Sequence, residues 1–309
     1  MTKTRLSFDS RGTRCAATLY RPTGTAASVP CVVMAHGFTG TQDQLAPSAE
    51  RFAAAGLAVL TFDFRHFGDS DGQPRQIVNI KKQLEDWRAA IALARTLEGV
   101  DPQRIALWGS SLSGGHVINL AAQVPTLAGV VAQVPAIGKS TRGMSTEAKA
   151  KMEREGIPLA ALILVSLRSI AAAVDDAVRG LLGLSPHYMR VFGRPGEVAA
   201  FTDPDSDKHL RFFTESGPTW RNAFAPRFLF GTPKYRQGTA ERLQMPLLVC
   251  VAELDTEADP ELATQIAKDA PHGELKTYPV GHFDVYVAPT FLHMVTDQLE
   301  FLRRTVDSE

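Results

Sequence analysis

The chain has 309 residues, and its 44% hydrophobic and 21% charged content is typical of a globular protein with a well-buried core. Lys and Arg total 33, as do Asp and Glu, so the zero formal net charge gives no reason to expect nucleic acid or an anionic membrane as a partner. The three cysteines lie far apart and the N-terminus has no apolar signal region, so we expect free thiols and a cytoplasmic location.

The first part of the chain predicts strands that alternate with helices. Continuous runs of β-branched and other apolar residues predict strands that are buried on both faces. Apolar residues at helical spacing predict the helices between them. In chain order we expect a hairpin over 5–9 and 14–22, strands over 29–38, 57–64, 104–109 and 127–135, and helices over 48–56, 79–99 and 114–124.

The same alternation returns near the end, with strands expected over 246–253 and 274–280 and helices over 261–270 and 290–306. It indicates an α/β fold with a mostly parallel central sheet and helices on both faces. Residues 138–242 break the alternation, and an unstructured loop of that length is very unusual. We therefore interpret residues 1–137 and 243–309 as the core and residues 138–242 as an inserted, mainly helical cap.

The predicted cap is expected to cover a pocket, because ligands of open α/β sheets bind at the carboxyl ends of the strands. Its aromatic residues should form the cap's own core, with a few lining the pocket: Phe201, Phe212, Phe213, Trp220, Phe224, Phe228 and Phe230. Arg168, Asp175 and Asp176 interrupt the apolar stretch that starts at Ile157, before the ~20 apolar residues that a membrane span needs. It therefore predicts a buried or amphipathic helix. A homodimer is left open, since periodicity alone does not show which face of that helix is exposed.

Three serines follow a predicted strand in the segment RIALWGSSLSGGHVINL, residues 104–120. In the G-x-S-x-G pattern a strand turns sharply into a helix, and the positions two before and two after the serine must be small. Ser111 has Gly109 and Ser113 at these positions, whereas Ser110 would have the bulky Trp108. Ser113 is sterically possible but would lie inside the helix. Ser111 is therefore the candidate nucleophile; the alternative is a serine N-cap with glycines for close packing.

A serine hydroxyl is a weak nucleophile and needs a base that is itself oriented by a third group. His282 directly follows the last predicted strand, where a loop would place an imidazole at the carboxyl edge of the sheet. Asp255 lies two residues beyond the preceding predicted strand and can reach that imidazole, with Glu253 as its rival. Glu257 and Asp259 are expected to start the next helix, where negative charge suits the helix dipole.

An oxyanion hole needs backbone N–H donors that point at the developing negative oxygen. One donor is expected from Leu112, the residue after the nucleophile. The other is expected from Phe38, in the turn that follows an earlier strand in the segment MAHGFTG. We assign no proton-transfer role to His36 in that turn.

The chain resembles the α/β-hydrolase superfamily over nearly its whole length. The segments AHGF, FDFRHFGDSDG, GSSLSGG, VAELD and GHFDVY occur in the superfamily's order, and the second is similar to its D-x-R-G-x-G-x-S stretch. QLEDWRAAI and VFGRPGEVAAFTDPDS resemble the capped group related to dienelactone hydrolases and X-Pro dipeptidyl peptidases. The resemblance implies a triad of Ser111, Asp255 and His282, with the N–H groups of Phe38 and Leu112 as oxyanion hole. His66 and Ser113 stand where the superfamily often has glycine.

These residues predict a serine hydrolase that cleaves a carboxylic ester or thioester through an acyl-enzyme. The expected partner is a small ester-like molecule with an apolar portion, and no cofactor or metal is needed because the histidines are dispersed without zinc-site spacing. An acyltransferase or a C–C bond hydrolase with the same triad remains an alternative. So does a non-catalytic binding protein on a hydrolase scaffold.

Overall fold

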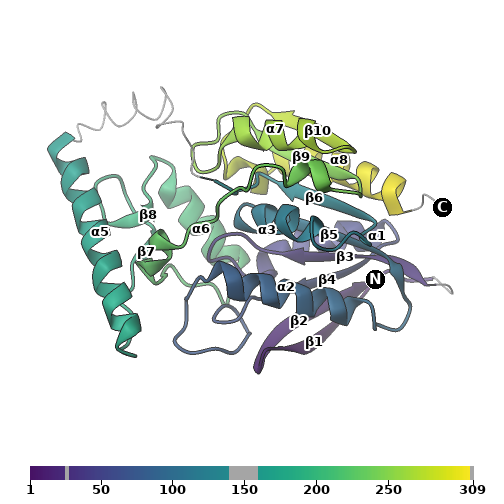
Figure 1. The fold of residues 1–309 in the computed structure, drawn as a ribbon, viewed down its shortest axis with the longest axis horizontal. Coiled ribbons are helices and arrows are strands. Elements are labelled where there is room, and N and C mark those ends of the chain that lie inside the picture. Colours follow the sequence, from purple (N-terminus) through teal and green to yellow (C-terminus); the bar gives the residue numbers. More distant parts are fainter. Residues whose placement is uncertain (25–27, 139–158, 307–309) are drawn as a thin grey trace.

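The computed structural model describes residues 1–24, 28–138 and 159–306. Its main sheet has eight strands in the order β1-β2-β4-β3-β5-β6-β9-β10 (Figure 1). β1 and β2 are antiparallel, and the six strands from β4 to β10 run parallel to one another. The strands are β1 Thr2–Ser10, β2 Thr13–Arg21, β3 Val29–Ala35, β4 Ala58–Phe62, β5 Val100–Ser110, β6 Gly129–Gln133, β9 Leu247–Ala252 and β10 Gly273–Tyr278.

Helices cover both faces of this sheet, which confirms the predicted α/β architecture. They are α1 Ala46–Ala54, α2 Ile80–Ala94, α3 Leu112–Ala121, α7 Pro260–Asp269 and α8 Thr290–Val306. On β3, Val33 packs in one apolar cluster with side chains of α2, α3 and α7, while its neighbour Val32 packs in a second cluster with α1 and α8. Because alternate side chains of a strand point to opposite faces, a continuously apolar strand is the pattern that two covered faces require.

The segment between β6 and β9 leaves the main sheet, although these two strands pair with each other. It contains α5 Leu159–Leu181, β7 Arg190–Phe192, β8 Ala199–Phe201 and α6 Ser206–Ser216 (Figure 1). A small cluster that includes Phe192, Trp220 and Phe224 forms its interior, and Phe38 packs against that cluster from the turn after β3. We keep the division into core and cap as our interpretation. The parallel β7–β8 pair was not expected from the sequence.

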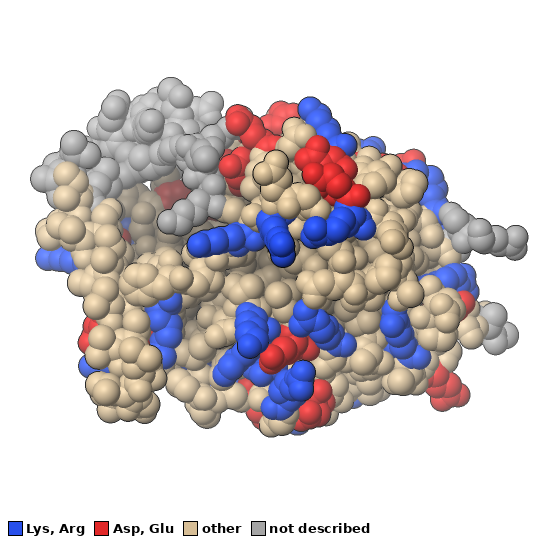
Figure 2. Space-filling model, in the orientation of Figure 1, with Lys and Arg blue, Asp and Glu red and all other residues tan. Residues whose placement is uncertain are grey.

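The outer face of α5 is apolar and exposed. Ile163, Leu167, Ile170, Val174 and Val178 are each about half exposed, and Figure 2 shows a largely uncharged surface at this end of the molecule. Among the helices of the described ranges, none combines the length and the apolar character that would let it cross a bilayer. The homodimer stays a prediction.

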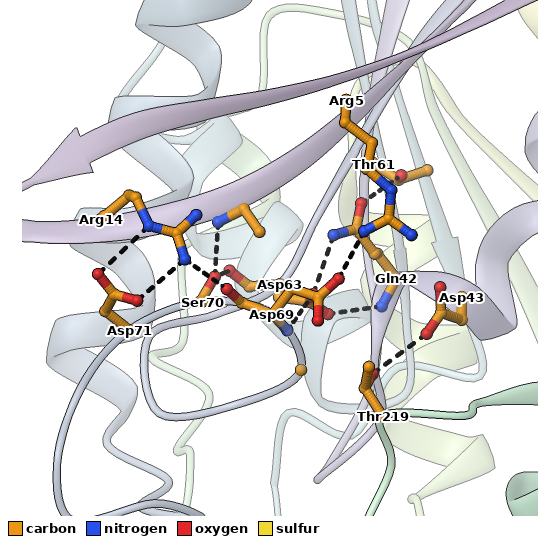
Figure 3. A network of polar contacts seen from close by, with 12 residues as sticks. Arg5, Arg14, Gln42, Asp43, Thr61, Asp63, Asp69, Ser70, Asp71 and Thr219 are labelled. Atoms are coloured by element: carbon orange, nitrogen blue, oxygen red, sulfur yellow. Dashed lines mark hydrogen bonds and ion pairs between the residues drawn. The ribbon is translucent and has the colours of Figure 1, made fainter.

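The segment that follows β4 braces the loop before α1. The buried Asp63 accepts hydrogen bonds from Gln42 N at 2.8 Å, Gln42 Nε2 at 2.9 Å and Asp69 N at 3.0 Å (Figure 3). A Cβ atom on Gly68 would lie 2.3 Å from this carboxylate. His66 has φ of 73°, in the left-handed region that favours glycine. This backbone conformation explains why the α/β-hydrolase superfamily often has glycine where this chain has His66. The histidine adopts the same conformation with strain.

We predict that Asp86→Ala lowers the free energy of unfolding by about 3–5 kcal/mol, the usual cost of breaking a buried ion pair. The fully buried Asp86 accepts hydrogen bonds from Arg65 Nε at 2.7 Å and Arg65 N at 3.1 Å, so its loss leaves a buried guanidinium whose nearest counter-charge among the described residues is Glu85, at a longer 3.4 Å. Urea denaturation measures the change. Asp71→Ala, which breaks an exposed pair with Arg14 at 2.9 Å, is the control and should cost less than about 1 kcal/mol. Equal losses in the two variants would contradict this account.

Candidate functional site

Ser111 lies at the sharp turn between β5 and α3 with φ of 55° and ψ of −118°. This conformation is strained for any residue with a side chain, and such strain concentrates at functional sites. The turn is also tight, since a Cβ atom on Gly109 would lie 2.2 Å from the carbonyl oxygen of Ser113. The backbone therefore accounts for the small residue required two positions before the serine.

Of the three serines in the turn, only Ser111 contacts an imidazole within the described chain. Its Oγ lies 3.0 Å from His282 Nε2. Ser110 Oγ lies 2.7 Å from the Tyr286 hydroxyl instead. Ser113 Oγ donates a hydrogen bond to the carbonyl oxygen of His36, so this side chain ties the turn to the loop after β3.

His282 and Asp255 meet because β9 and β10 are parallel neighbours, so the loops after them start at the same edge of the sheet. His282 Nδ1 lies 2.6 Å from Asp255 Oδ2. The other carboxylate oxygen of Asp255 accepts hydrogen bonds from the amides of Glu257 at 2.8 Å and Ala258 at 2.9 Å. These bonds hold the carboxylate in place before any ligand arrives. Glu253 is exposed and does not take this position.

The charges around His282 make its protonated form more stable than that of an ordinary histidine in water. Burial alone would lower the pKa of His282, but the Asp255 carboxylate, through its charge and its hydrogen bond, and the charge of Glu257 outweigh burial and raise it. In the neutral ring, Nδ1–H donates to Asp255, which leaves Nε2 free to accept the Ser111 hydroxyl proton. Burial lowers the pKa of His36 to about 4, so that ring is neutral near pH 7.

Two residues near Ser111 have backbone N–H groups without a protein acceptor among the described residues. Leu112 is the first residue of α3, and an N–H at that position has no acceptor within its helix. Phe38 follows Gly37, where an added Cβ atom would lie 2.9 Å from Ser111 Cβ. Within the described ranges, no residue accepts a hydrogen bond from the Phe38 amide. The structure thus brings together all five residues that the sequence selected.

We predict that Gly37→Ala lowers kcat by about 100-fold, because a displacement of about 1 Å at a reacting centre has effects of that size. The new methyl group would push against Ser111 Cβ at 2.9 Å and the Ser110 carbonyl oxygen at 3.1 Å. Steady-state kinetics measure the loss. The control is Gly12→Ala in the β1–β2 turn, whose φ of 80° is strained for alanine but which has no atom within 4 Å of the added methyl. It should lose stability without losing kcat, and a kcat loss as large as that of Gly37→Ala would contradict the prediction.

Two cavities share Ser111, Phe38 and Phe201 in their walls. A narrow one of about 40 Å³ contains His282 and is lined further by Phe192, Phe212, Phe213, Phe283 and Tyr286. A larger one of about 360 Å³ lies on the side of Leu112 and is lined further by Phe224, Phe228, Leu229, Thr232 and Glu257. Both walls are mostly apolar, as is usual for small-molecule sites.

The predicted cap aromatics divide between these walls and other surroundings. Phe201, Phe212, Phe213, Phe224 and Phe228 line a cavity. Trp220 belongs to the interior cluster of this segment, and Phe230 is 62% exposed.

The prediction for Glu257 was wrong. α7 begins at Pro260 with Asp259 as its N-cap, so Glu257 lies outside the helix, on the wall of the larger cavity. Phe192, Phe283 and Tyr286 also line the narrow cavity, although no sequence pattern predicted this role for them. Of these, Phe283 could have been found from its place next to His282. Among the described residues, His, Cys, Asp and Glu side chains form no group of three or more that could hold a metal ion.

Comparison with known proteins shows which family the sequence of this chain matches. Residues 27–181 match the family described as serine aminopeptidase, S33. The quorum-quenching protein AidA of Acinetobacter baumannii is 39% identical over 303 residues, which cover 97% of this chain and 94% of AidA. Thiohydrolase apmlB of Arthrinium phaeospermum is 29% identical over 291 residues and 88% of each chain.

The fold also matches solved structures. The α/β hydrolase GrgF from Penicillium sp. sh18 aligns over 100% of both chains with a TM-score of 0.77 and 20% identity, a likeness of fold. The predicted α/β-hydrolase fold is therefore confirmed. With half of its sequence matched by the family and a relative that aligns over nearly its full length, the chain belongs to the serine aminopeptidase S33 family of α/β hydrolases.

Proposed function

We propose that the chain is a serine hydrolase that cleaves a carboxylic ester or thioester through an acyl-enzyme. The observation that carries the proposal is the contact chain from Ser111 Oγ to His282 Nε2 at 3.0 Å and from His282 Nδ1 to Asp255 Oδ2 at 2.6 Å, beside two apolar cavities. A nucleophile, a base and an orienting carboxylate at these distances are the arrangement that acyl transfer needs.

In the proposed first step Ser111 Oγ bonds to the substrate carbonyl carbon while its proton moves to His282 Nε2. Asp255 stabilises the resulting imidazolium, and the N–H groups of Phe38 and Leu112 stabilise the oxyanion, each by ~3 kcal/mol. The tetrahedral intermediate then collapses, and His282 gives the proton to the departing alcohol or thiol. In the second step water loses a proton to His282 and attacks the acyl-enzyme. The bond between the acyl carbon and Ser111 Oγ then breaks as His282 returns the proton to Oγ, which releases the carboxylic acid and restores the free enzyme.

The substrate is proposed to have an apolar portion, because phenylalanine rings dominate the walls around Ser111. The name of one relative, a thiohydrolase, supports hydrolysis in general terms. The same name favours including thioesters. The narrower grouping with dienelactone hydrolases and X-Pro dipeptidyl peptidases stays a prediction from motif similarity.

The experiment is a turnover series with p-nitrophenyl esters and matched thioesters of increasing acyl length. We expect hydrolysis of short and medium chains and a fall in kcat/KM once the acyl group exceeds the cavity. An added alcohol or amine that captures the acyl group in preference to water would support the acyltransferase alternative. Absence of both turnover and acyl-enzyme formation over the whole series would support a non-catalytic binding protein and contradict the proposal.

A further inference from the structure

The wall of the larger cavity contains a carboxyl group among apolar side chains. Among its described lining residues, Glu257 is the only one with an ionisable side chain. The other polar side chains on the described part of this wall are the hydroxyls of Ser111 and Thr232. The remaining described residues of the wall are aromatic or aliphatic residues, glycine and proline. A ligand in this cavity can therefore be recognised by shape and by one strong hydrogen-bonding group.

The position of Glu257 is fixed by the turn that holds Asp255. Its amide donates to Asp255 Oδ1 at 2.8 Å, and the next amide, that of Ala258, donates to the same oxygen at 2.9 Å. The carboxyl group is therefore carried on the same short turn as the acid beside His282. Ser111 and Glu257 line the same cavity, so a substrate that is bound to Ser111 and extends into this cavity would come close to Glu257.

The carboxyl group of Glu257 has few partners within the described chain. Among the described residues its one polar contact is with Thr256 Oγ1, which donates at a long 3.4 Å. Burial raises the pKa of Glu257 to about 7; the charges of Asp255 and Asp203 act in the same direction, and that of His282 opposes them. Glu257 is a half-buried acceptor that receives few hydrogen bonds from the protein. A ligand that donates a hydrogen bond to it therefore binds more tightly than one that does not.

The two cavities indicate which half of the substrate reaches Glu257. His282 must give its proton to the leaving group, so that group has to lie beside the imidazole, and His282 lines the narrow cavity. The larger cavity contains Leu112 and Glu257 but not His282. With its carbonyl at Ser111, the substrate therefore directs its acyl portion into the larger cavity.

We propose that Glu257 is a specificity-determining residue that accepts a hydrogen bond from an N–H or O–H group on the acyl chain of the substrate. The inference rests on the proposed function and narrows it to esters or thioesters whose apolar acyl chain carries an amide or hydroxyl donor. A site built to hydrogen-bond such a group discriminates against an analogue that lacks it, because the half-buried Glu257 carboxylate is then left without a hydrogen-bond donor.

The test compares p-nitrophenyl esters whose acyl chain contains either a secondary amide or its N-methyl derivative, over a short series of spacers. At pH 8.5, where a carboxyl with a pKa of about 7 is ionised, we expect wild-type kcat/KM to favour the N–H compound by about 10–100-fold at the best spacer, as the loss of a hydrogen bond to a charged group predicts. Glu257→Leu should abolish this ratio, because it should lower kcat/KM for the N–H compound far more than for the N-methyl compound or the plain alkyl ester. Glu257→Gln, which retains an acceptor oxygen, should keep part of the ratio.

Thr232→Val is the matched control, because it removes the other hydroxyl on the wall besides that of Ser111 and should keep the ratio. The inference is overturned if the wild type shows no preference at any spacer, if Glu257→Leu retains the preference, or if Thr232→Val removes it. An equal loss for both esters in Glu257→Leu and Glu257→Gln would mean a structural role and also overturn it. Labelling of Ser111 by a fluorophosphonate separates the two proposals: labelled protein without selectivity contradicts only this inference, whereas wild type without turnover or label contradicts the proposed function as well.

Discussion

Ser111→Ala is expected to lower kcat for ester hydrolysis by about 10⁶-fold, the size of effect seen when a triad nucleophile is removed. The variant keeps His282 and Asp255 in contact at 2.6 Å, but it has no oxygen to form the acyl bond. Residual turnover would come from binding and from the oxyanion donors alone. Single-turnover kinetics with the best ester of the series measure the loss.

The neighbouring serine supplies the control. Ser113→Ala removes the hydrogen bond to the His36 carbonyl oxygen but leaves Ser111 beside the imidazole. It should keep most of the activity and lose about 1 kcal/mol of stability. A variant Ser111→Ala that still turns over esters, or a Ser113→Ala variant that does not, would place the nucleophile elsewhere in the turn.

Asp255→Asn is expected to lower kcat by about 10⁴-fold, as in other triads where the acid is replaced by its amide. The amide oxygen can still accept from Glu257 N and Ala258 N, so its NH₂ group is turned toward His282 Nδ1. The ring proton then moves to Nε2, and that nitrogen can no longer accept the Ser111 hydroxyl. The measurement is kcat against pH.

The pH profile gives this prediction a second readout. The pKa of His282 is raised in the folded protein, so activity in the wild type is lost as pH falls through a value above the ordinary 6.5. Without the Asp255 charge the imidazolium is less stable. The acid limb of the profile, where kcat falls with falling pH, should therefore move to lower pH. Asp259→Asn, at the N-cap of α7, is the matched control and should change neither kcat nor the limb, since asparagine caps helices about as well as aspartate. An acid limb that stays in place in Asp255→Asn would contradict the assignment.

The strands of the main sheet could be predicted because both faces are covered. A strand such as β4, buried at all five positions, is apolar except for Thr61, whose hydroxyl donates to Gln42 Oε1, and that run is visible in the sequence. The segment between β6 and β9 gave weaker signals. β7 and β8 are three residues each, and α6 follows a stretch rich in Pro, Gly and Asp, so neither period nor length identifies these elements.

The residues of the site could be predicted from the sequence for a different reason. A strand that turns into a helix at Ser111 and the loops after β9 and β10 each place a polar residue at one edge of the sheet, so chain order selects the candidates. Glu257 was missed because an acidic residue just before a helix is already explained by the helix dipole. Only the turn around Asp255, which holds Glu257 before α7 begins at Pro260, shows that Glu257 lines a cavity.

The most direct test is to treat the wild-type protein with a fluorophosphonate and identify the modified residue by peptide mass spectrometry. The account predicts one covalent adduct, on Ser111, which His282→Ala should slow strongly because the hydroxyl then loses its base at 3.0 Å. An adduct on Ser110 or Ser113, or no adduct under conditions where a known serine esterase is fully labelled, would contradict the claim that Ser111 is the nucleophile.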